Sequence, residues 1–125
     1  MIQRDFEFRA YSITEAKLFF VFGFNSGLVF EQIFEKDRIK ENVYERENCF
    51  IDQYIGVTDK TGRKIFENDI ILWEGKKGVV VWEDVRFCIR FEEHEIPQNI
   101  PSYYLKKSEI IGTVYENKDL LSLIG

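Results

Sequence analysis

Glu67 and Asp69 are the two residues of this chain whose type and spacing suit chemistry best. Two carboxylates so close together can perform acid–base work or bind a hard cation through their oxygens. A calcium or magnesium site needs further oxygen ligands in register, and the neighbouring sequence supplies no such series. The alternative is that both carboxylates accept N–H bonds and fix the turn before the next strand. We favour this structural role.

The other candidates for catalysis or metal binding stand alone in the sequence. His94 is the one histidine and lies in a glutamate-rich loop, without the additional His or Cys ligands that a transition metal needs. Cys49 and Cys88 lie far apart among apolar neighbours, which predicts buried free thiols in preference to a disulfide or a nucleophile. No phosphate-binding loop, nucleophile elbow or zinc-protease motif occurs. We therefore expect a protein that is not an enzyme, with no catalytic residue, metal or cofactor.

The composition indicates one globular domain with a sizeable core. The chain has 125 residues and a mass of 14.9 kDa, with 45% hydrophobic and 16% aromatic residues. A chain of this size can bury a core without metal or disulfide support. The longest apolar run, Leu18 to Phe22, is far shorter than the roughly 20 residues that span a bilayer. The first residues also lack the apolar block of a signal peptide, so we expect a cytoplasmic protein with no membrane partner.

Charge is distributed unevenly along the chain. The net charge is −5, whereas the region from Gln53 to Phe91 contains seven basic and six acidic residues. A net-acidic protein is repelled by nucleic acid unless its basic groups cluster in space. Lys76–Lys77, Arg63–Lys64 and Lys106–Lys107 are candidates for such a cluster. We favour the simpler interpretation, in which they belong to a solvated surface.

The first part of the chain predicts a strand followed by an aromatic hairpin. Phe6, Phe8 and Ala10 alternate with charged residues, as in a strand with one buried face. Leu18 to Phe22 and Leu28 to Phe30 are short apolar runs on either side of the sequence GFNSG. We expect these two runs to pair, because the glycines between them permit the positive φ that a reversal needs.

The charged segment Gln32 to Asn48 leaves two alternatives open. Its apolar residues are spaced in a way that suits either a helix or a partly ordered connector. At the other end of the chain, Glu116 to Ile124 predicts a short helical turn, and Asn117 is placed to cap its free N–H groups.

From Phe50 onward the pattern is strongly β. The expected strands, with turns at Asp59–Gly62 and Gly75–Gly78, are Phe50 to Val57, Ile70 to Trp73, Gly78 to Trp82, Arg86 to Phe91, Tyr103 to Leu105 and Glu109 to Tyr115. Short strands at this spacing favour a barrel or sandwich over a parallel sheet. We predict a mainly β fold, either a small SH3-like barrel or a compact antiparallel β domain, with an N-terminal β-hairpin or helical segment and a short C-terminal helix. Residues 1–125 would form one domain, with the hairpin and connector in 1–49 and the barrel-like core in 50–125.

Three separated motifs of this chain resemble the pattern of a known family. They are Phe8–Arg9–Ala10, then Tyr54, Gly56, Asp59, Gly62, Ile65, Phe66, Glu67, Asp69 and Ile70, and finally Ile111, Gly112, Tyr115, Glu116 and Asn117. The family is YopX, whose members are small proteins carried by bacteriophages and prophages. Asn68 stands where the pattern usually has Gly, and Lys118 where it usually has Pro. The resemblance implies a phage or prophage context and a fold, but no activity, because the family has none established.

The first function that fits these observations is a non-catalytic protein-interaction module. Its partner would be a host or phage protein or a second copy of the chain, as in a homo-oligomer. The surplus of aromatic residues motivates it, because aromatic side chains dominate interface cores. Phe19, Phe22 and Phe24 of the expected hairpin are the candidate contact residues. The alternative is that these rings only fill the core.

The second function is that of a nucleic-acid-binding SH3-like domain. Basic side chains would bind the phosphates, and a tryptophan would stack on the bases. The candidate residues are Lys76, Lys77, Arg86 and Arg90, with Trp73 or Trp82. We favour the interaction module, because the region that holds these residues is only weakly basic.

Overall fold

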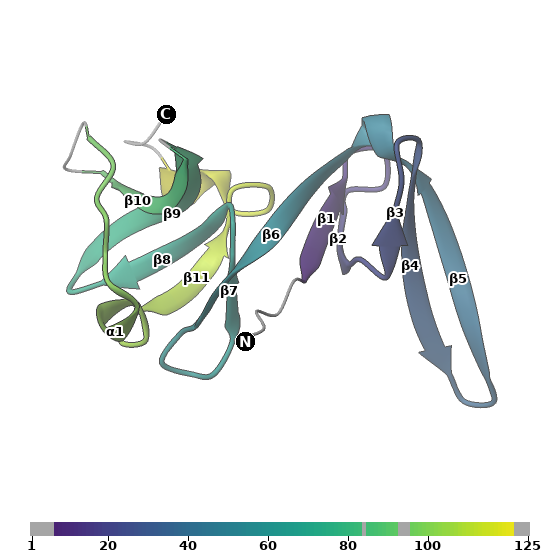
Figure 1. Cartoon of the computed structure of the whole chain (residues 1–125), viewed down its shortest axis with the longest axis horizontal. Coiled ribbons are helices and arrows are strands. Elements are labelled where there is room, and N and C mark those ends of the chain that lie inside the picture. The colour runs from purple at the N-terminus through teal and green to yellow at the C-terminus, as the bar shows by residue number, and fades with distance from the viewer. Residues whose placement is uncertain (1–6, 84, 93–95, 122–125) are drawn as a thin grey trace. The chain divides into compact units, whose positions relative to one another are not determined.

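The computed structural model describes residues 7–83, 85–92 and 96–121. These residues form mainly antiparallel β structure, which confirms the expected fold class (Figure 1). The chain divides into two compact units, here called the N-terminal unit, Phe6–Gln53, and the C-terminal unit, which begins at Tyr54. The division between the units lies between Gln53 and Tyr54, inside a strand. The sequence pattern predicts it a few residues earlier, between residues 49 and 50. No helix among the described residues is long and apolar enough to cross a lipid bilayer.

The N-terminal unit contains two groups of antiparallel strands. Its elements are β1 (Phe8–Ser12), β2 (Lys17–Phe20), β3 (Gly23–Phe24), β4 (Leu28–Glu35), β5 (Arg38–Glu45), the 3-10 turn η1 (Arg46–Asn48) and the first half of β6 (Cys49–Thr58). β1 pairs with β2 on one side and with the first half of β6 on the other. The other group has the order β3-β4-β5, so β5 lies at its edge.

The core of the N-terminal unit is small and lies between these two groups. Its buried residues come from four strands and are Ala10, Phe19, Val29 and Tyr44. The Phe19 and Tyr44 rings stack with their centroids 4.3 Å apart. Arg9 lies on the opposite face of β1 from Ala10, where its Nη2 donates to Asp52 Oδ2 over 3.1 Å, and both side chains are buried. Phe19 therefore contributes to folding and is not available for contact with a partner.

Two expectations for the N-terminal unit need correction. The reversal at GFNSG does form, because Asn25 Oδ1 accepts the N–H groups of Gly27 and Leu28, each over 2.8 Å. It joins β3 to β4, however, whereas β2 pairs with β1. The segment Gln32 to Asn48 is neither a helix nor a connector, since most of it forms the β4–β5 hairpin. The apolar spacing suited a helix equally well, and only pairing across the hairpin decides for strands.

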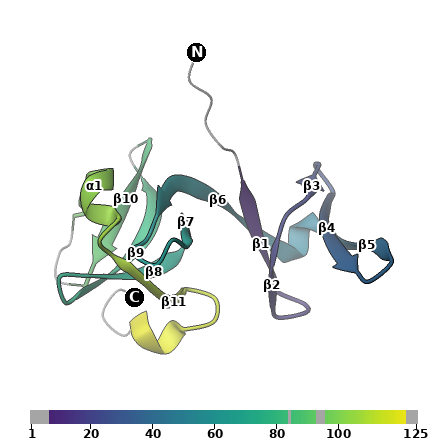
Figure 2. The same ribbon diagram turned by 90° about the horizontal axis from the view of Figure 1, so that it is seen from below.

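The C-terminal unit is built around a curved sheet with the strand order β10-β9-β8-β11 (Figures 1 and 2). Its elements after the second half of β6 are β7 (Lys64–Phe66), β8 (Asp69–Trp73), β9 (Lys76–Glu83), β10 (Arg86–Phe91), the single-turn helix α1 (Ser102–Leu105), β11 (Glu109–Thr113) and the 3-10 turn η2 (Lys118–Leu121). One face of the sheet covers the core, which consists of Ile65, Ile71, Val80, Ile89, Phe91, Leu105 and Ile110.

Two segments near the end of the chain differ from expectation. Residues 103–105, expected as a strand, belong to α1, whose Tyr104 and Leu105 N–H groups donate to the carbonyl oxygen of Pro101. β11 ends at Thr113, because the side-chain amide oxygen of Asn117 folds back and accepts the Thr113 N–H. The Asn117 carbonyl oxygen accepts the Leu120 N–H, so this residue contributes to the start of η2 through its main chain.

The turn between β8 and β9 is shorter than expected. Trp73 pairs with Lys76, and the two residues between them, Glu74 and Gly75, both have positive φ. This is the backbone pattern of a two-residue hairpin turn whose twist matches that of the strands. The expected loop Gly75–Gly78 is therefore wrong, and Lys76 and Lys77 are strand residues whose side chains point to opposite faces of the sheet.

Asp59 connects the turn after β6 to the distant strand β11. Its Oδ1 accepts the N–H groups of Thr61 and Arg63 and the Thr61 hydroxyl, and its Oδ2 accepts the N–H of Ile110 over 3.0 Å. Burial raises the pKa of the Asp59 carboxyl, but these donors outweigh burial and bring the pKa below its ordinary value. The expected turn at Asp59–Gly62 is confirmed, and Gly62 has the positive φ that it requires.

Replacing Asp59 by Asn should lower the free energy of unfolding by about 1–3 kcal/mol at neutral pH, because a charged acceptor of four hydrogen bonds is lost. A carboxyl whose folded pKa is depressed stabilises the fold above its unfolded pKa of about 3.9, and this contribution disappears as the pH falls through the folded pKa. The difference between the wild type and Asp59→Asn should therefore shrink in urea titrations carried out at progressively lower pH. The exposed residue Asp37 provides a control, Asp37→Asn, and a pH-independent difference for Asp59→Asn would contradict the role assigned to the charge.

Gly78 is the point of β9 where the core leaves no space for a side chain. A Cβ at this position would lie 2.6 Å from Ile89 Cγ2 and 2.9 Å from Phe91 Cδ1. We expect Gly78→Ala to lower the free energy of unfolding by about 1–3 kcal/mol, as overpacking of a core does. Gly27→Ala is the matched control, because the nearest atom there is 3.9 Å away. Equal midpoints for the two variants in chemical denaturation would show that the core adapts.

Candidate interaction surface

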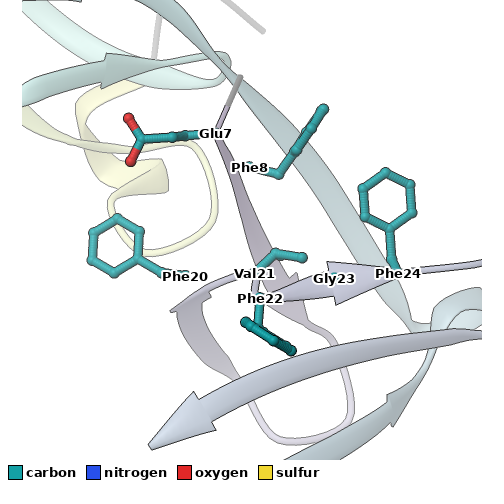
Figure 3. A pocket seen from close by; sticks show the side chains of 7 residues that line it. All are labelled: Glu7, Phe8, Phe20, Val21, Phe22, Gly23 and Phe24. Carbon is teal, nitrogen blue, oxygen red and sulfur yellow. The ribbon is translucent and has the colours of Figure 1, made fainter. Parts of the chain in front are cut away.

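A shallow hollow of about 370 Å³ in the N-terminal unit is lined by residues from the beginning of the chain, four of which are phenylalanines (Figure 3). Its lining comes from the start of β1 with the residue before it, from the end of β2, from the link to β3 and from β3 itself. The lining residues are Glu7, Phe8, Phe20, Val21, Phe22, Gly23 and Phe24. Pockets that accept an apolar group are typically concave and lined by such side chains, with few polar groups. We call this site the aromatic hollow.

Local contacts set the positions of the rings around the aromatic hollow. Val21 and Phe22 link β2 to β3. The Val21 N–H donates to the carbonyl oxygen of Phe8 in β1, and the Phe22 N–H donates to the carbonyl oxygen of Phe30 in β4. The Phe8 and Phe24 rings meet edge to face with their centroids 5.2 Å apart. The Arg46 guanidinium lies 5.0 Å from the Phe24 ring and also donates to the Asn25 carbonyl oxygen. Phe24 is thus held from both sides.

The three phenylalanines proposed as contact residues differ in their exposure to solvent. Phe22 is 62% exposed and Phe24 is 37% exposed, and both line the aromatic hollow. Phe19 is only 5% exposed and stacks on Tyr44, so its assignment to the contact surface is corrected. Phe20 replaces Phe19 as a candidate contact residue. Adjacent residues of a strand point to opposite faces, and Phe20 is 73% exposed.

The β4–β5 hairpin presents a second apolar surface, which the sequence did not reveal. Its register, Leu28↔Glu45 to Glu35↔Arg38, continues without interruption, so alternate residues share a face. The inner face includes Val29 and Tyr44, which belong to the core. The opposite face carries the apolar residues Leu28, Phe30, Phe34, Ile39 and Val43, together with Gln32, Glu41 and Glu45. We call it the outer face of the hairpin.

A polar cluster next to the core fastens the inner side of this hairpin. Glu31 Oε1 accepts hydrogen bonds from Lys17 Nζ over 2.9 Å and from the Tyr44 hydroxyl over 2.8 Å, with a longer one from Asn42. Burial would raise the pKa of Glu31, but these donors bring it below its ordinary value. Burial and the bond to Glu31 raise the pKa of Tyr44, which therefore remains a neutral donor. From Phe34 to Glu41 every side chain is exposed, so the tip of the hairpin extends past this cluster (Figure 1).

The structure does not gather the four basic residues proposed for phosphate binding. Lys76 and Arg86 lie at opposite ends of the β9–β10 region, roughly 20 Å apart along the strands. Lys77 forms an ion pair of 3.2 Å with Glu92. Arg90 donates to Glu83 through two nitrogens, over 2.6 and 2.9 Å. The hydrogen bonds to Arg90 lower the pKa of Glu83, and those to Glu83 raise the pKa of Arg90, so each stabilises the charge of the other.

The two tryptophans proposed for base stacking are also placed apart. Trp73 is half-buried against the core, with its ring centroid 6.0 Å from that of Phe91 and 6.3 Å from that of Tyr104. Trp82 is exposed and meets Phe87 edge to face at 4.7 Å. The two residues lie in different strands at different ends of the sheet. They do not form one stacking platform with the proposed cations.

Of the residues considered for catalysis or metal binding, Asp69 forms a hydrogen bond that supports the fold, and both cysteines are at least partly buried. Asp69 is buried, and its Oδ2 accepts the N–H of Phe66 over 2.8 Å, which supports the turn between β7 and β8. Burial raises the pKa of both thiols, Cys49 and Cys88, and so keeps them protonated. Within the described ranges, no three His, Cys, Asp or Glu side chains come close enough to hold a metal ion. His94 lies outside the described residues.

Phe19 and Phe22 provide a direct test of the division between core and surface. Phe19→Ala should lower the free energy of unfolding by about 3–5 kcal/mol, because it removes a buried, stacked ring. Phe22→Ala should change it by no more than about 0.5 kcal/mol, since its ring is largely in solvent. Urea unfolding followed by far-ultraviolet circular dichroism measures both. Similar losses for the two variants would mean that Phe22 is part of the core.

Comparison with known proteins adds a family and a fold. The model of the family described as YopX protein matches residues 7–122, which is nearly the whole chain. A solved structure, protein EF1440 from Enterococcus faecalis, superposes with a TM-score of 0.68 at 18% sequence identity, covering 96% of this chain and 100% of that one. At such identity the likeness concerns the fold alone. No curated protein shows significant sequence similarity to this chain. Because the family model spans both units, this chain belongs to the YopX protein family.

Proposed function

We propose that this chain is a non-catalytic protein-interaction or self-assembling module that acts in the cytoplasm of a bacterial host carrying a phage or prophage. The observation that carries the proposal is the apolar surface of the N-terminal unit. The aromatic hollow and the outer face of the hairpin expose large apolar side chains that the small core does not use. Contiguous exposed apolar patches are characteristic of protein interaction sites. Membership of the YopX family supports the phage context.

The aromatic hollow has the properties of an anchoring site for a partner. Aromatic side chains are enriched among the residues that dominate binding energy, and they act by filling well-packed pockets. Phe20 and Phe22 present most of their rings to solvent, whereas the contact with Phe8 and Arg46 holds Phe24 in place. A site whose shape exists before binding loses less conformational entropy when a partner docks. An apolar side chain of a partner protein is the group that fits it.

The non-catalytic character of the proposal rests on what surrounds the reactive groups. Asp59 and Asp69 accept backbone N–H bonds that hold turns together. Protonated thiols are poor nucleophiles, and burial keeps both cysteines in that form. The contacts described above therefore assign these groups to support of the fold.

Nucleic-acid binding by an SH3-like C-terminal unit is the weaker alternative. The curved sheet of that unit is compatible with such a domain, but Lys77 and Arg90 are engaged by Glu92 and Glu83. A phosphate that bound either cation would compete with a neighbouring carboxylate. A steep loss of binding with salt would be the signature of this alternative.

The test is an affinity pull-down of the tagged full chain from host lysate, with and without nuclease, followed by mass spectrometry. Wild type is compared with the double variant Phe20→Ser, Phe22→Ser, which removes the exposed rings of the aromatic hollow. We expect a protein partner that survives nuclease and whose recovery falls by about tenfold or more in the double variant, because hot-spot truncations typically cost 2 kcal/mol or more.

The matched control is the double variant Val85→Ser, Ile96→Ser, which removes two exposed apolar side chains of the C-terminal unit. It should retain the partner at the wild-type level. Equal recovery by all three proteins would remove the aromatic hollow from the proposal. Loss of every partner after nuclease, or recovery of nucleic acid in place of protein, would favour the nucleic-acid alternative.

A further inference from the structure

The outer face of the hairpin combines apolar side chains with charges of one sign. Phe34 is 75% exposed, Ile39 59% and Val43 52%. Glu41 and Glu45 lie on the same face, whereas the cations of β5, Arg38 and Lys40, point to the other one. Between Leu28 and Glu35 and between Arg38 and Glu45, no Lys or Arg lies on the outer face. A partner for this face must therefore supply apolar surface together with positive charge.

The same charges argue against pairing of two outer faces with each other. In a two-fold contact each surface meets its own copy, so the acidic residues of both hairpins would be brought together. Like charges brought together at an interface cost free energy and suppress that arrangement. The edge of β5 is protected in a similar way, because Arg38, Lys40 and Glu41 interrupt its apolar residues, as charges do on natural edge strands.

The C-terminal unit carries a surface with the complementary properties. Tyr103 is 64% exposed and Tyr104 is 45% exposed, and their rings meet edge to face at 5.4 Å. The Lys107 ammonium lies 4.5 Å from the centre of the Tyr103 ring. Lys106 is also exposed, and neither lysine forms an ion pair with a described residue. We call Tyr103, Tyr104, Lys106 and Lys107 the tyrosine–lysine patch.

We propose that the outer face of the hairpin of one copy binds the tyrosine–lysine patch of a second copy. The inference rests on the self-assembling form of the proposed function and names its two surfaces. Phe34 and Ile39 would pack on the tyrosine rings, while Glu41 faces the lysine ammonium groups. Because the two surfaces are different, each copy has one of each, and successive contacts produce a closed ring or an open chain.

The size of the surfaces sets the strength of a single contact. The apolar patches of typical monomers measure about 300–600 Å², and a standard interface buries about 800 Å² on each partner. A hairpin face and a single helical turn belong at the lower end of this scale. We therefore expect assembly that depends on protein concentration and weakens with added salt, since exposed charges are screened.

The test is sedimentation velocity of the full chain over about two decades of concentration. Two variants each remove one surface: a hairpin variant, Phe34→Ser with Ile39→Ser, and a patch variant, Tyr103→Ser with Lys107→Glu. Wild type should form assemblies larger than a dimer, and each variant alone should remain monomeric. An equimolar mixture of the two should form a one-to-one dimer and stop there, because the mixture retains one intact hairpin on the patch variant and one intact patch on the hairpin variant.

Controls separate this outcome from damage to the fold. Ile13→Ser and Lys118→Glu change exposed residues outside both surfaces, and they should assemble like wild type. All variants should have the wild-type circular dichroism spectrum. A monomeric wild type at every concentration would overturn the inference, as would self-association of the patch variant or a mixture that stays monomeric. These outcomes concern only contacts between copies, so the pull-down on the aromatic hollow tests the proposed function separately.

Discussion

The length of the β4–β5 hairpin relative to the core of its unit is the constraint on which the outer face of the hairpin depends. Val29 and Tyr44 lie near the base of the hairpin, and they are its residues in the buried core. The polar cluster at Glu31 closes that core, and the strands continue beyond it to Glu35 and Arg38. A two-stranded ribbon without a covered face has little stability of its own in water. Its stability must come from the base, and its free part remains available for contact.

Several residues of the family pattern fix turns and strand ends of the fold. Asp59 joins a turn to β11, and Asp69 holds the turn before β8. Gly112 has no space for a side chain, because the Asn117 side chain occupies the position that a Cβ would take. Asn68, which replaces a glycine of the pattern, has a φ of 68°, a conformation that asparagine tolerates better than most residues. These positions determine turn geometry and strand ends. The fold therefore accounts for these positions of the family pattern.

The two units differ in where they place several of their phenylalanine residues. In the C-terminal unit Phe66, Phe91 and Trp73 lie in or beside the core. In the N-terminal unit Phe19 alone among the phenylalanines of β2 and β3 enters the core, and its neighbours surround the aromatic hollow. Composition could not separate these cases, since the same residue type serves both. The proposed interaction surfaces therefore depend on which face of each strand is covered.

The sequence by itself determined the β character of the chain, a reversal within Gly23–Gly27, the turn at Asp59–Gly62, and the family, because these depend on local alternation and on residues with special backbone preferences. It also named Phe22 and Phe24 as candidate contact residues, and their role in contact stays a prediction although both rings are exposed. It misassigned Phe19, residues 103–105, the loop at Gly75–Gly78 and the segment 32–48, and it joined strands that do not pair. Strand partners, covered faces and the separation of Lys76 from Arg86 arise between residues distant in sequence. Such pairing is set by long-range burial and register, so only the tertiary structure decided it.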